Sequence, residues 1–376
     1  MAYLDNSATT AVYPASAALA VRMMTECFGN PSSLHTLGFE AEQQMTAARK
    51  QIAALISAEP DAVIFTSGGT EANNLALLGA AEAKKRDGKH VLTSQTEHPS
   101  VSAACDRLEA LGFEVERLAP RPDGNIDPEA VYAACRPDTV LVSLMTVNNE
   151  TGARFPWETV HAEIRRRAPR AILHTDAVQA AGKLALSVQK MGVDLLSMSG
   201  HKLHAPKGVG ALYVRKGVRL TPPAALGGGQ EKGRRSGTEN VPGIVAFGDA
   251  ASRLPAPAEA DQLYRSLRDT LLDGLRAFSG IVPHLPENGV PYIVNFSMPG
   301  FKSETLLHFL AQRQVYVSGG SACAKGHKSP VLTAMGLPAN EIDSALRVSF
   351  SDQNTKDDVQ ALLDALRDAR DTLIHT

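Results

Sequence analysis

The stretch AILHTDAVQAAGKLALSVQKMGVDLLSMSGHK, residues 171–202, decides the fold of this chain. It contains two short apolar runs, 171–178 and 195–199, and both end in a polar cluster. Similar runs occur on either side of it, at 63–67, 90–94, 139–147 and 210–214, and helical patterns lie between several runs, at 70–86 and 99–112. Strands that alternate with helices predict an α/β fold with a mostly parallel central sheet.

The composition is that of a globular protein. Of the 376 residues, 44% are hydrophobic and 21% are charged, which allows a large domain and a smaller one. The net charge of −2 gives no basic signal for direct binding of nucleic acid. The start, MAYLDNSATT, lacks the apolar segment of a signal peptide, and no apolar stretch is long enough for a membrane helix. We therefore expect a cytoplasmic protein with no membrane partner.

Four cysteines occur along the chain: Cys27, Cys105, Cys135 and Cys323. No two of them form a CxxC pair, so neither a zinc site nor a disulfide framework is indicated. Dispersed cysteines fit a reducing compartment. We expect no metal site.

The stretch LPAPAEAD, residues 254–261, is rich in proline and alanine and is the predicted domain boundary. We expect a large domain over 15–255, and a small domain formed by 1–14 and 256–376. The last helix is predicted to begin near Thr355, a residue type favoured at helix N-caps, because two aspartates follow in the first turn.

Polar clusters follow several of the predicted strands. They read TSGGTE, TSQTEH, TVNNE, HTDAVQ and SMSGHK. In parallel α/β sheets, ligands bind beyond the carboxyl ends of the strands. The clusters therefore predict one functional site at that edge of the sheet.

Lys202 and Asp176 each end a predicted strand. A lysine there is usually a solvated surface charge, but in a cleft its amine becomes nucleophilic and forms Schiff bases with aldehydes such as pyridoxal phosphate. Asp176 either caps the next helix or pairs with the ring nitrogen of that cofactor, which keeps the nitrogen protonated. Gln179 lies one helical turn further, within reach of the phenolic oxygen of the ring.

The glycines of TSGGTE precede a predicted helix that opens at Thr70. Most such loops only cap a helix, but next to Lys202 and Asp176 this one also suits a phosphate group. His98 is either a loop histidine or a flat partner for the pyridine ring. Asn149 is placed to hydrogen-bond oxygens of the ring or the substrate.

Cys323 lies in SGGSACAKGHKSP, residues 318–330, among glycines and positive charges. Lys325, His327 and Lys328 would lower the pKa of a neighbouring thiol and favour the reactive thiolate. The alternatives are a basic surface that docks an acidic partner, and a merely solvated loop with an incidental thiol. The glycines would allow such a loop to move.

Taken together, the motifs resemble those of the cysteine desulfurases. The resemblance runs from about Tyr3 to Ser351 and is carried by LDNSATT, FGNPSSLH, FTSGGTEANN, TEH, VNNETG, HTDAVQ, SGHKLHAPKGVGALYVR, GGGQEKGRRSGTEN and SGGSACAKG. These enzymes are the NifS/IscS-like branch of the class-V aminotransferases, with the fold-type I architecture of pyridoxal-phosphate enzymes. The resemblance implies a mostly parallel sheet with helices on both faces and a smaller α+β C-terminal domain. The Ser-Ala-Cys segment distinguishes this branch from other enzymes with SGHK.

The resemblance also implies a role for each matching residue. Lys202 would bind pyridoxal 5'-phosphate and carry the α-proton of the substrate, Asp176 would pair with the pyridine nitrogen, and His98 would stack on the ring. The residues that would contact the rest of the cofactor are Gln179 at the phenolic oxygen, Gly69, Thr70, Ser199 and His201 at the phosphate, and Thr238 at the phosphate of the neighbouring subunit in a homodimer. Asn149 and Arg347 would bind the substrate carboxylate, whereas without the resemblance a surface ion pair is the simpler reading of Arg347.

The implied reaction converts L-cysteine to L-alanine, with the sulfur captured as a persulfide on Cys323. An acceptor protein would take the sulfur, either a scaffold for iron–sulfur clusters or an enzyme of tRNA thiolation or thiamin synthesis. The segment after Cys323 is shorter than in the housekeeping type, so the destination stays open. Three rivals remain at this point: a selenocysteine lyase, an aminotransferase and a non-catalytic binding protein.

Overall fold

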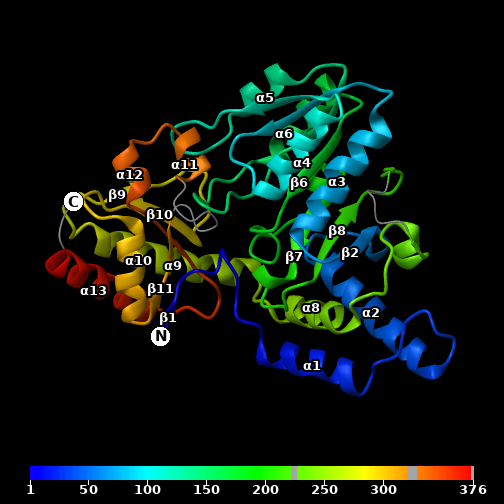
Figure 1. Cartoon of the computed structure of the whole chain (residues 1–376), viewed down its shortest axis with the longest axis horizontal. Coiled ribbons are helices and arrows are strands. Elements are labelled where there is room, and N and C mark those ends of the chain that lie inside the picture. The colour runs from blue at the N-terminus through cyan, green and yellow to red at the C-terminus, as the bar shows by residue number, and fades with distance from the viewer. Residues whose placement is uncertain (222–226, 320–327, 374–376) are drawn as a thin grey trace.

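The computed structural model describes residues 1–221, 227–319 and 328–373. Cys323, Lys325 and His327 lie outside these ranges. Figure 1 shows two parts side by side. One part contains a large central sheet and its helices, and the other contains a smaller sheet with its own helices.

The central sheet has seven strands in the order β2-β8-β7-β6-β5-β3-β4. Their bounds are β2 Val63–Thr66, β3 His90–Ser94, β4 Glu114–Leu118, β5 Thr139–Ser143, β6 Ile172–Asp176, β7 Leu195–Ser199 and β8 Gly210–Val214. β4, β3, β5, β6 and β7 pair in parallel, and β8 runs antiparallel to both of its neighbours. The predicted mostly parallel sheet is confirmed, and the carboxyl ends of β3, β5, β6 and β7 meet at one edge.

The predicted strands differ from the observed ones mainly at their ends. The run at 139–147 ends as a strand at Ser143, and the run at 171–178 forms a strand only over Ile172–Asp176. The sequence analysis missed β4, whose sequence EVERL places charged side chains at alternate positions. An edge strand with one solvated face lacks the apolar run by which the other strands were recognised.

Helices cover both faces of the central sheet. They are α1 Pro14–Thr25, α2 Thr36–Ala54, α3 Gly69–Lys84, α4 Pro99–Ala110, α5 Pro128–Ala134, α6 Trp157–Arg167, α7 Val188–Met191 and α8 Val241–Arg253. Leu195 of β7 belongs to the apolar cluster under α3 and α4, whereas the next residue, Leu196, belongs to the cluster on the other face. Successive strand residues point to opposite faces, so both faces of this sheet are buried.

The smaller sheet is antiparallel, with strands in the order β12-β13-β10-β9. Its strands are β9 Val282–His284, β10 Ile293–Ser297, β12 Ser318–Gly319 and β13 Ala345–Ser349, and the nearby helices are α9 Pro257–Leu275, α10 Ser303–Gln312, α11 Pro330–Ala334, α12 Ala339–Asp343 and α13 Lys356–Thr372. This α+β arrangement confirms the predicted smaller element of the fold. Thr355 caps α13 in a reciprocal capping box with Asp358, as its sequence indicated.

The N-terminus joins the smaller sheet. Strand β1, Ala2–Tyr3, pairs in parallel with β11, Val315–Tyr316. The grouping of 1–14 with 256–376 and the boundary at residue 255 stay predictions.

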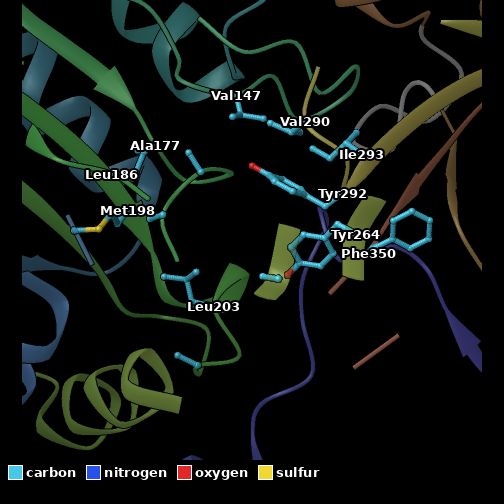
Figure 2. Packing of buried hydrophobic residues seen from close by; sticks show 14 of the residues in the cluster. Val147, Ala177, Leu186, Met198, Leu203, Tyr264, Val290, Tyr292, Ile293 and Phe350 are labelled. Carbon is cyan, nitrogen blue, oxygen red and sulfur yellow. The ribbon is translucent and has the colours of Figure 1, made fainter. Parts of the chain in front are cut away.

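An apolar layer joins the two sheets (Figure 2). Tyr292, just before β10, points its hydroxyl toward the segment after β6 and donates to the main-chain oxygen of Gln179 at 2.9 Å. Its ring packs edge-on against Tyr264 of α9, with centroids 5.4 Å apart. The smaller sheet is therefore held against the chain segment that follows Asp176. Within the described ranges, every helix is too short or too polar to cross a membrane.

Candidate active site

Lys202 ends the 3-10 turn Gly200–Lys202, which follows directly from β7. Its Nζ donates to the main-chain oxygens of Ser7 at 2.6 Å and Ala8 at 2.5 Å. The N-terminal segment therefore lies over the end of β7, where the polar clusters were predicted to meet. The amine is held at the sheet edge and is not a solvated surface charge.

Asp176 is the last residue of β6 and is only 4% exposed. One carboxylate oxygen accepts from Asn73 Nδ2 at 2.7 Å, and the other accepts from the main-chain N–H of Val178 at 2.9 Å. A carboxylate has about four lone-pair sites, so Asp176 can accept a further donor such as a protonated ring nitrogen.

Gln179 shares an acceptor with Lys202. Its Nε2 donates to the main-chain oxygen of Ser7 at 3.0 Å, the same atom that accepts from Lys202. Its Oε1 is buried and has no hydrogen-bond partner among the described residues. A buried polar atom of this kind normally finds a partner, so the site offers Oε1 to a ligand.

The phosphate site is predicted at the N-terminus of α3. Its cap, Gly68, has a φ of 156°, and a Cβ on Gly69 would lie 2.8 Å from Cγ2 of Val178. A Cβ on Gly68 would lie 3.9 Å from Oγ of Ser199, so the end of β7 faces this helix terminus. The N–H groups in the first turn, which includes Thr70, have no partner within the helix and suit an anion.

His201 adjoins Lys202 and the N-terminal segment. Its Nδ1 lies 3.2 Å from Oγ1 of Thr9. Burial lowers the pKa of His201 to about 4, with a further contribution from the charge of Lys202. The ring is therefore neutral at physiological pH, and a neutral imidazole still has an N–H that suits the predicted contact with a phosphate.

His98 is linked to Asp176 through two side chains. Its Nδ1 lies 2.8 Å from Oγ of Ser100, which also accepts from Asn73 Nδ2 at 2.8 Å, and Asn73 donates to Asp176. Burial lowers the pKa of His98, while the charge of Asp176 acts in the opposite direction and that of Lys202 in the same direction. A neutral ring fixed in this way fits the predicted stacking role.

Arg347, in β13, is 4% exposed. Its Nη2 donates to Oδ1 of Asp5 at 2.7 Å, and its Nη1 donates to the main-chain oxygen of Asn149 at 2.9 Å. Nε is buried without a partner among the described residues. Because the guanidinium is buried, the reading of Arg347 as a surface ion pair is wrong. It lies beside Asn149 and keeps a donor for a further anion.

The described residues on either side of the segment that carries Cys323 lie close to Arg347 and to Glu150, the neighbour of Asn149. Gly319 pairs with Leu346, the neighbour of Arg347, in the β12–β13 ladder. Where the described chain resumes, Ser329 donates from Oγ to Oε2 of Glu150 at 2.5 Å. Lys328 is exposed, with Nζ 3.9 Å from Asp343.

Thr238 lies exposed in the chain before α8. The hydrogen bonds of the described ranges do not join it to Lys202 or Ser199. Arg235, three residues earlier, pairs with Glu71 in the first turn of α3 at 2.7 Å. An exposed Thr238 is available to a second subunit.

Several residues that the fold brings into the site had no predicted role: Asp5, Ser7, Asn73, Ser100 and Glu150. A signal existed for Asn73, because it follows Thr70 by three residues in a predicted helix and so shares a face with it. Asp5 and Ser7 lie within LDNSATT, a motif that carried the resemblance without a function of its own. Among the described residues, no group of three His, Cys, Asp or Glu side chains could hold a metal ion.

Comparison with known proteins gives consistent results. The family described as aminotransferase class-V matches residues 2–362. A cysteine desulfurase of Gluconacetobacter diazotrophicus is 43% identical over 371 residues, which cover 97% of this chain and 92% of that protein. The cysteine desulfurase IscS of Methanosarcina thermophila is 41% identical over 372 residues, which cover 97% and 90%.

Two solved structures resemble the whole fold. A NifS-like protein superposes with a TM-score of 0.92 at 34% identity, and the match covers 99% of both chains. A structure described as SspA in complex with cysteine gives a TM-score of 0.82 at 34% identity, and covers 93% of this chain and 99% of that one.

Proposed function

This chain belongs to the class-V aminotransferase family, and from that premise we propose that it is a cysteine desulfurase. It converts L-cysteine to L-alanine, and Cys323 captures the sulfur as a persulfide. The observation that carries the proposal is the shared acceptor of Lys202 and Gln179 at the sheet edge, next to Asp176 and the N-terminus of α3. These residues suit pyridoxal phosphate, the cofactor of the family.

The fit to the cofactor rests on polar atoms that the protein leaves available. Asp176 has lone pairs for a ring nitrogen, and Gln179 Oε1 is buried with no partner in the part of the chain that the structure describes. The glycine-capped start of α3, with Ser199 and His201, suits the phosphate. When bound, the cofactor acts as an electron sink for the carbon atoms of the substrate.

The residues of the chain supply binding, proton transfer and sulfur capture. The guanidinium of Arg347, with Asn149 beside it, binds the carboxylate of L-cysteine. The amine of Lys202 takes the α-proton of the substrate. The thiolate of Cys323 attacks the substrate sulfur, so that the C–S bond breaks, an S–S bond forms and the freed carbon takes up a proton. L-Cysteine and one protein thiol thus become L-alanine and one protein persulfide.

The functional unit is a homodimer. Of the large apolar side chains that are exposed, six lie between residues 21 and 39: Val21, Met24, Phe28, Leu34, Leu37 and Phe39. Such a concentration of exposed apolar surface favours an interface. Thr238 is exposed and contacts the phosphate bound by the neighbouring subunit.

A sulfur-acceptor protein completes the reaction. The persulfide has to leave Cys323 before the next turnover, so a carrier must reach it. The destination is iron–sulfur cluster assembly, tRNA thiolation or thiamin synthesis, and a pull-down with the persulfide form separates these three.

Mass spectrometry tests the proposed function. The purified protein, with its bound cofactor, is mixed with L-cysteine. Alanine should appear, and the peptide that contains Cys323 should gain the mass of one sulfur atom. Cys323→Ser should keep the yellow colour of the bound cofactor and release no sulfide.

Each rival predicts a different result. An aminotransferase would retain its activity in Cys323→Ser, because its chemistry needs no thiol. A selenocysteine lyase would form alanine from selenocysteine and not from cysteine. A binding protein would be colourless and form no alanine.

A further inference from the structure

A small pocket is lined by Glu97, the residue that precedes His98 in the chain. Glu97, Asn125 and Arg154 are among its lining residues, together with parts of the chain around Leu144 and Asn148. The volume that the centre of a water-sized sphere can occupy in this pocket is about 10 Å³. That space is close to the minimum for a single water molecule.

Three polar atoms of the lining residues lack a hydrogen-bond partner among the described residues. They are Oε2 of Glu97, Oδ1 of Asn125 and Nε of Arg154. Glu97 is 7% exposed and Asn125 is 6% exposed. Buried polar atoms nearly always have a partner, so three such atoms in the lining of one pocket indicate that a ligand belongs there.

The neighbouring hydrogen bonds fix which of these atoms donate. Oε1 of Glu97 accepts from Ser94 Oγ at 2.8 Å and from the main-chain N–H of Met145 at 3.0 Å. A proton on Glu97 therefore sits on Oε2. Asn125 donates from Nδ2 to Asp123 at 2.6 Å, so its unpaired Oδ1 is an acceptor.

A water molecule matches this set of atoms. It can accept from Glu97 Oε2–H and from Arg154 Nε–H, and it can donate to Asn125 Oδ1. We propose that the pocket binds one water molecule shared by Glu97, Arg154 and Asn125, and that Glu97 positions His98 through this contact. The positioning role rests on the proposed function, while the water site does not.

Glu97 connects two parts of the site. It precedes His98 in the turn that opens α4, and it binds the chain beyond β5 through Met145 N–H. Loss of its proton would place a negative charge in the pocket and remove the donor to the water, which would shift the turn that holds the imidazole of His98.

The surroundings of Glu97 favour its uncharged form. Burial raises the pKa of Glu97 to about 8, with a smaller contribution from the negative charge of Asp176, while the hydrogen bonds from Met145 N–H and Ser94 act in the opposite direction. Of the other groups nearby, Arg154 lines the same pocket, and the Cys105 thiol is uncharged because burial raises its pKa to about 12.

A crystal structure of the holoenzyme tests the water site directly. We expect one water within hydrogen-bond distance of all three atoms, and the same water in Glu97→Gln with the amide as donor. A dry pocket in both proteins would overturn the proposal. Neither outcome depends on turnover of cysteine, so failure of the proposed function is recognised separately.

Cofactor affinity as a function of pH tests the positioning role. The dissociation constant of pyridoxal phosphate is followed by absorbance from pH 6 to 10 in the wild type, in Glu97→Gln and in Glu109→Gln, an exposed control on α4. Above about pH 8, the dissociation constant should rise about tenfold per pH unit in the wild type and the control, relative to that of Glu97→Gln. The difference arises because the amide of Gln cannot ionise. Parallel curves for all three proteins would refute the positioning role.

Discussion

Arg347 and Asp5 are 342 residues apart in the chain and form an ion pair between a buried guanidinium and a half-buried carboxylate, with Nη2 and Oδ1 separated by 2.7 Å. The same guanidinium holds the main-chain oxygen of Asn149. One side chain therefore joins the N-terminal segment, the turn after β5 and the smaller sheet, and its Nε has no partner among the residues that the structure describes.

Arg347→Lys should raise the KM for L-cysteine at least tenfold and change kcat less. An ammonium group lacks the planar fork of a guanidinium, so it cannot hold Asp5, Asn149 and a substrate carboxylate together. Alanine formation at varied cysteine concentration measures both constants. Arg313→Lys, at the end of α10, is the control, and an unchanged KM in Arg347→Lys would exclude Arg347 from carboxylate binding.

The contact between Glu150 and Ser329 should affect sulfur capture and leave cofactor binding unchanged. Ser329 Oγ caps α11 by accepting from Leu332 N–H at 3.0 Å, and the same hydroxyl donates a hydrogen bond to Glu150. Glu150→Leu should slow persulfide formation on Cys323 about tenfold, which is the effect of one charge-assisted hydrogen bond. Mass spectrometry at short reaction times measures the rate.

A double-mutant cycle separates this contact from other effects of the substitutions. Ser329→Ala should have little further effect in the Glu150→Leu background, because the shared hydrogen bond is already lost. Full additivity of the two substitutions would show that the residues act independently. Glu304→Leu, on the exposed side of α10, controls for loss of an acidic side chain.

Lys183 should make the stability of the protein depend on alkaline pH. Its amine is buried without a hydrogen-bond partner in the described ranges, and the Tyr292 ring lies 5.1 Å away. Burial lowers its pKa from 10.5 to about 7, with smaller contributions from Lys202 and Arg347. Between these values the unfolded chain keeps a proton that the folded chain lacks, so the free energy of unfolding rises with pH.

Lys183→Met removes this dependence. The variant should be the more stable protein at pH 7. Between pH 7 and 9, the free energy of unfolding of the wild type should rise by about 2 kcal/mol relative to that of the variant. Urea unfolding at both pH values measures the difference. The exposed Lys190→Met should follow the wild type, and a pH-independent difference for Lys183→Met would show that the amine does not titrate in this range.

Leu34→Asp combined with Phe28→Asp should convert the dimer into single chains. The two side chains are 104% and 65% exposed in the isolated chain, and charges at the centre of an apolar interface are strongly unfavourable. Light scattering after size exclusion measures the mass. Leu285 is an apolar residue outside this cluster and is 46% exposed, so the control variant Leu285→Asp should remain a dimer. A wild type with the mass of one chain would refute the dimer.

The sequence predicted those parts of the fold and site that depend on local pattern. β3, β7 and β8 have the predicted bounds, because each is an apolar run that ends abruptly at polar residues or glycine. Lys202, Asp176 and the start of α3 follow such strands, so the topology of a parallel sheet brings them together.

Contacts over long sequence separations could not be predicted in the same way. Nothing local to Asp5 indicates Arg347 as its partner, and nothing local to Ser7 indicates that its main-chain oxygen accepts from both Lys202 and Gln179. Such pairs are set by the packing of the two sheets. The edge strand β4 was missed for a different reason, because its charged residues interrupt the apolar pattern.

The position of the N-terminal segment has a consequence for biosynthesis. Residues 2–8 are translated long before their partners, because β1 pairs with β11, and Leu4 accepts from the main-chain N–H of Ser349. The central sheet lies between these two segments in the chain. A nascent chain can therefore form the central sheet early, but it cannot fix Ser7 and Ala8 over Lys202 until β11 and β13 have been made.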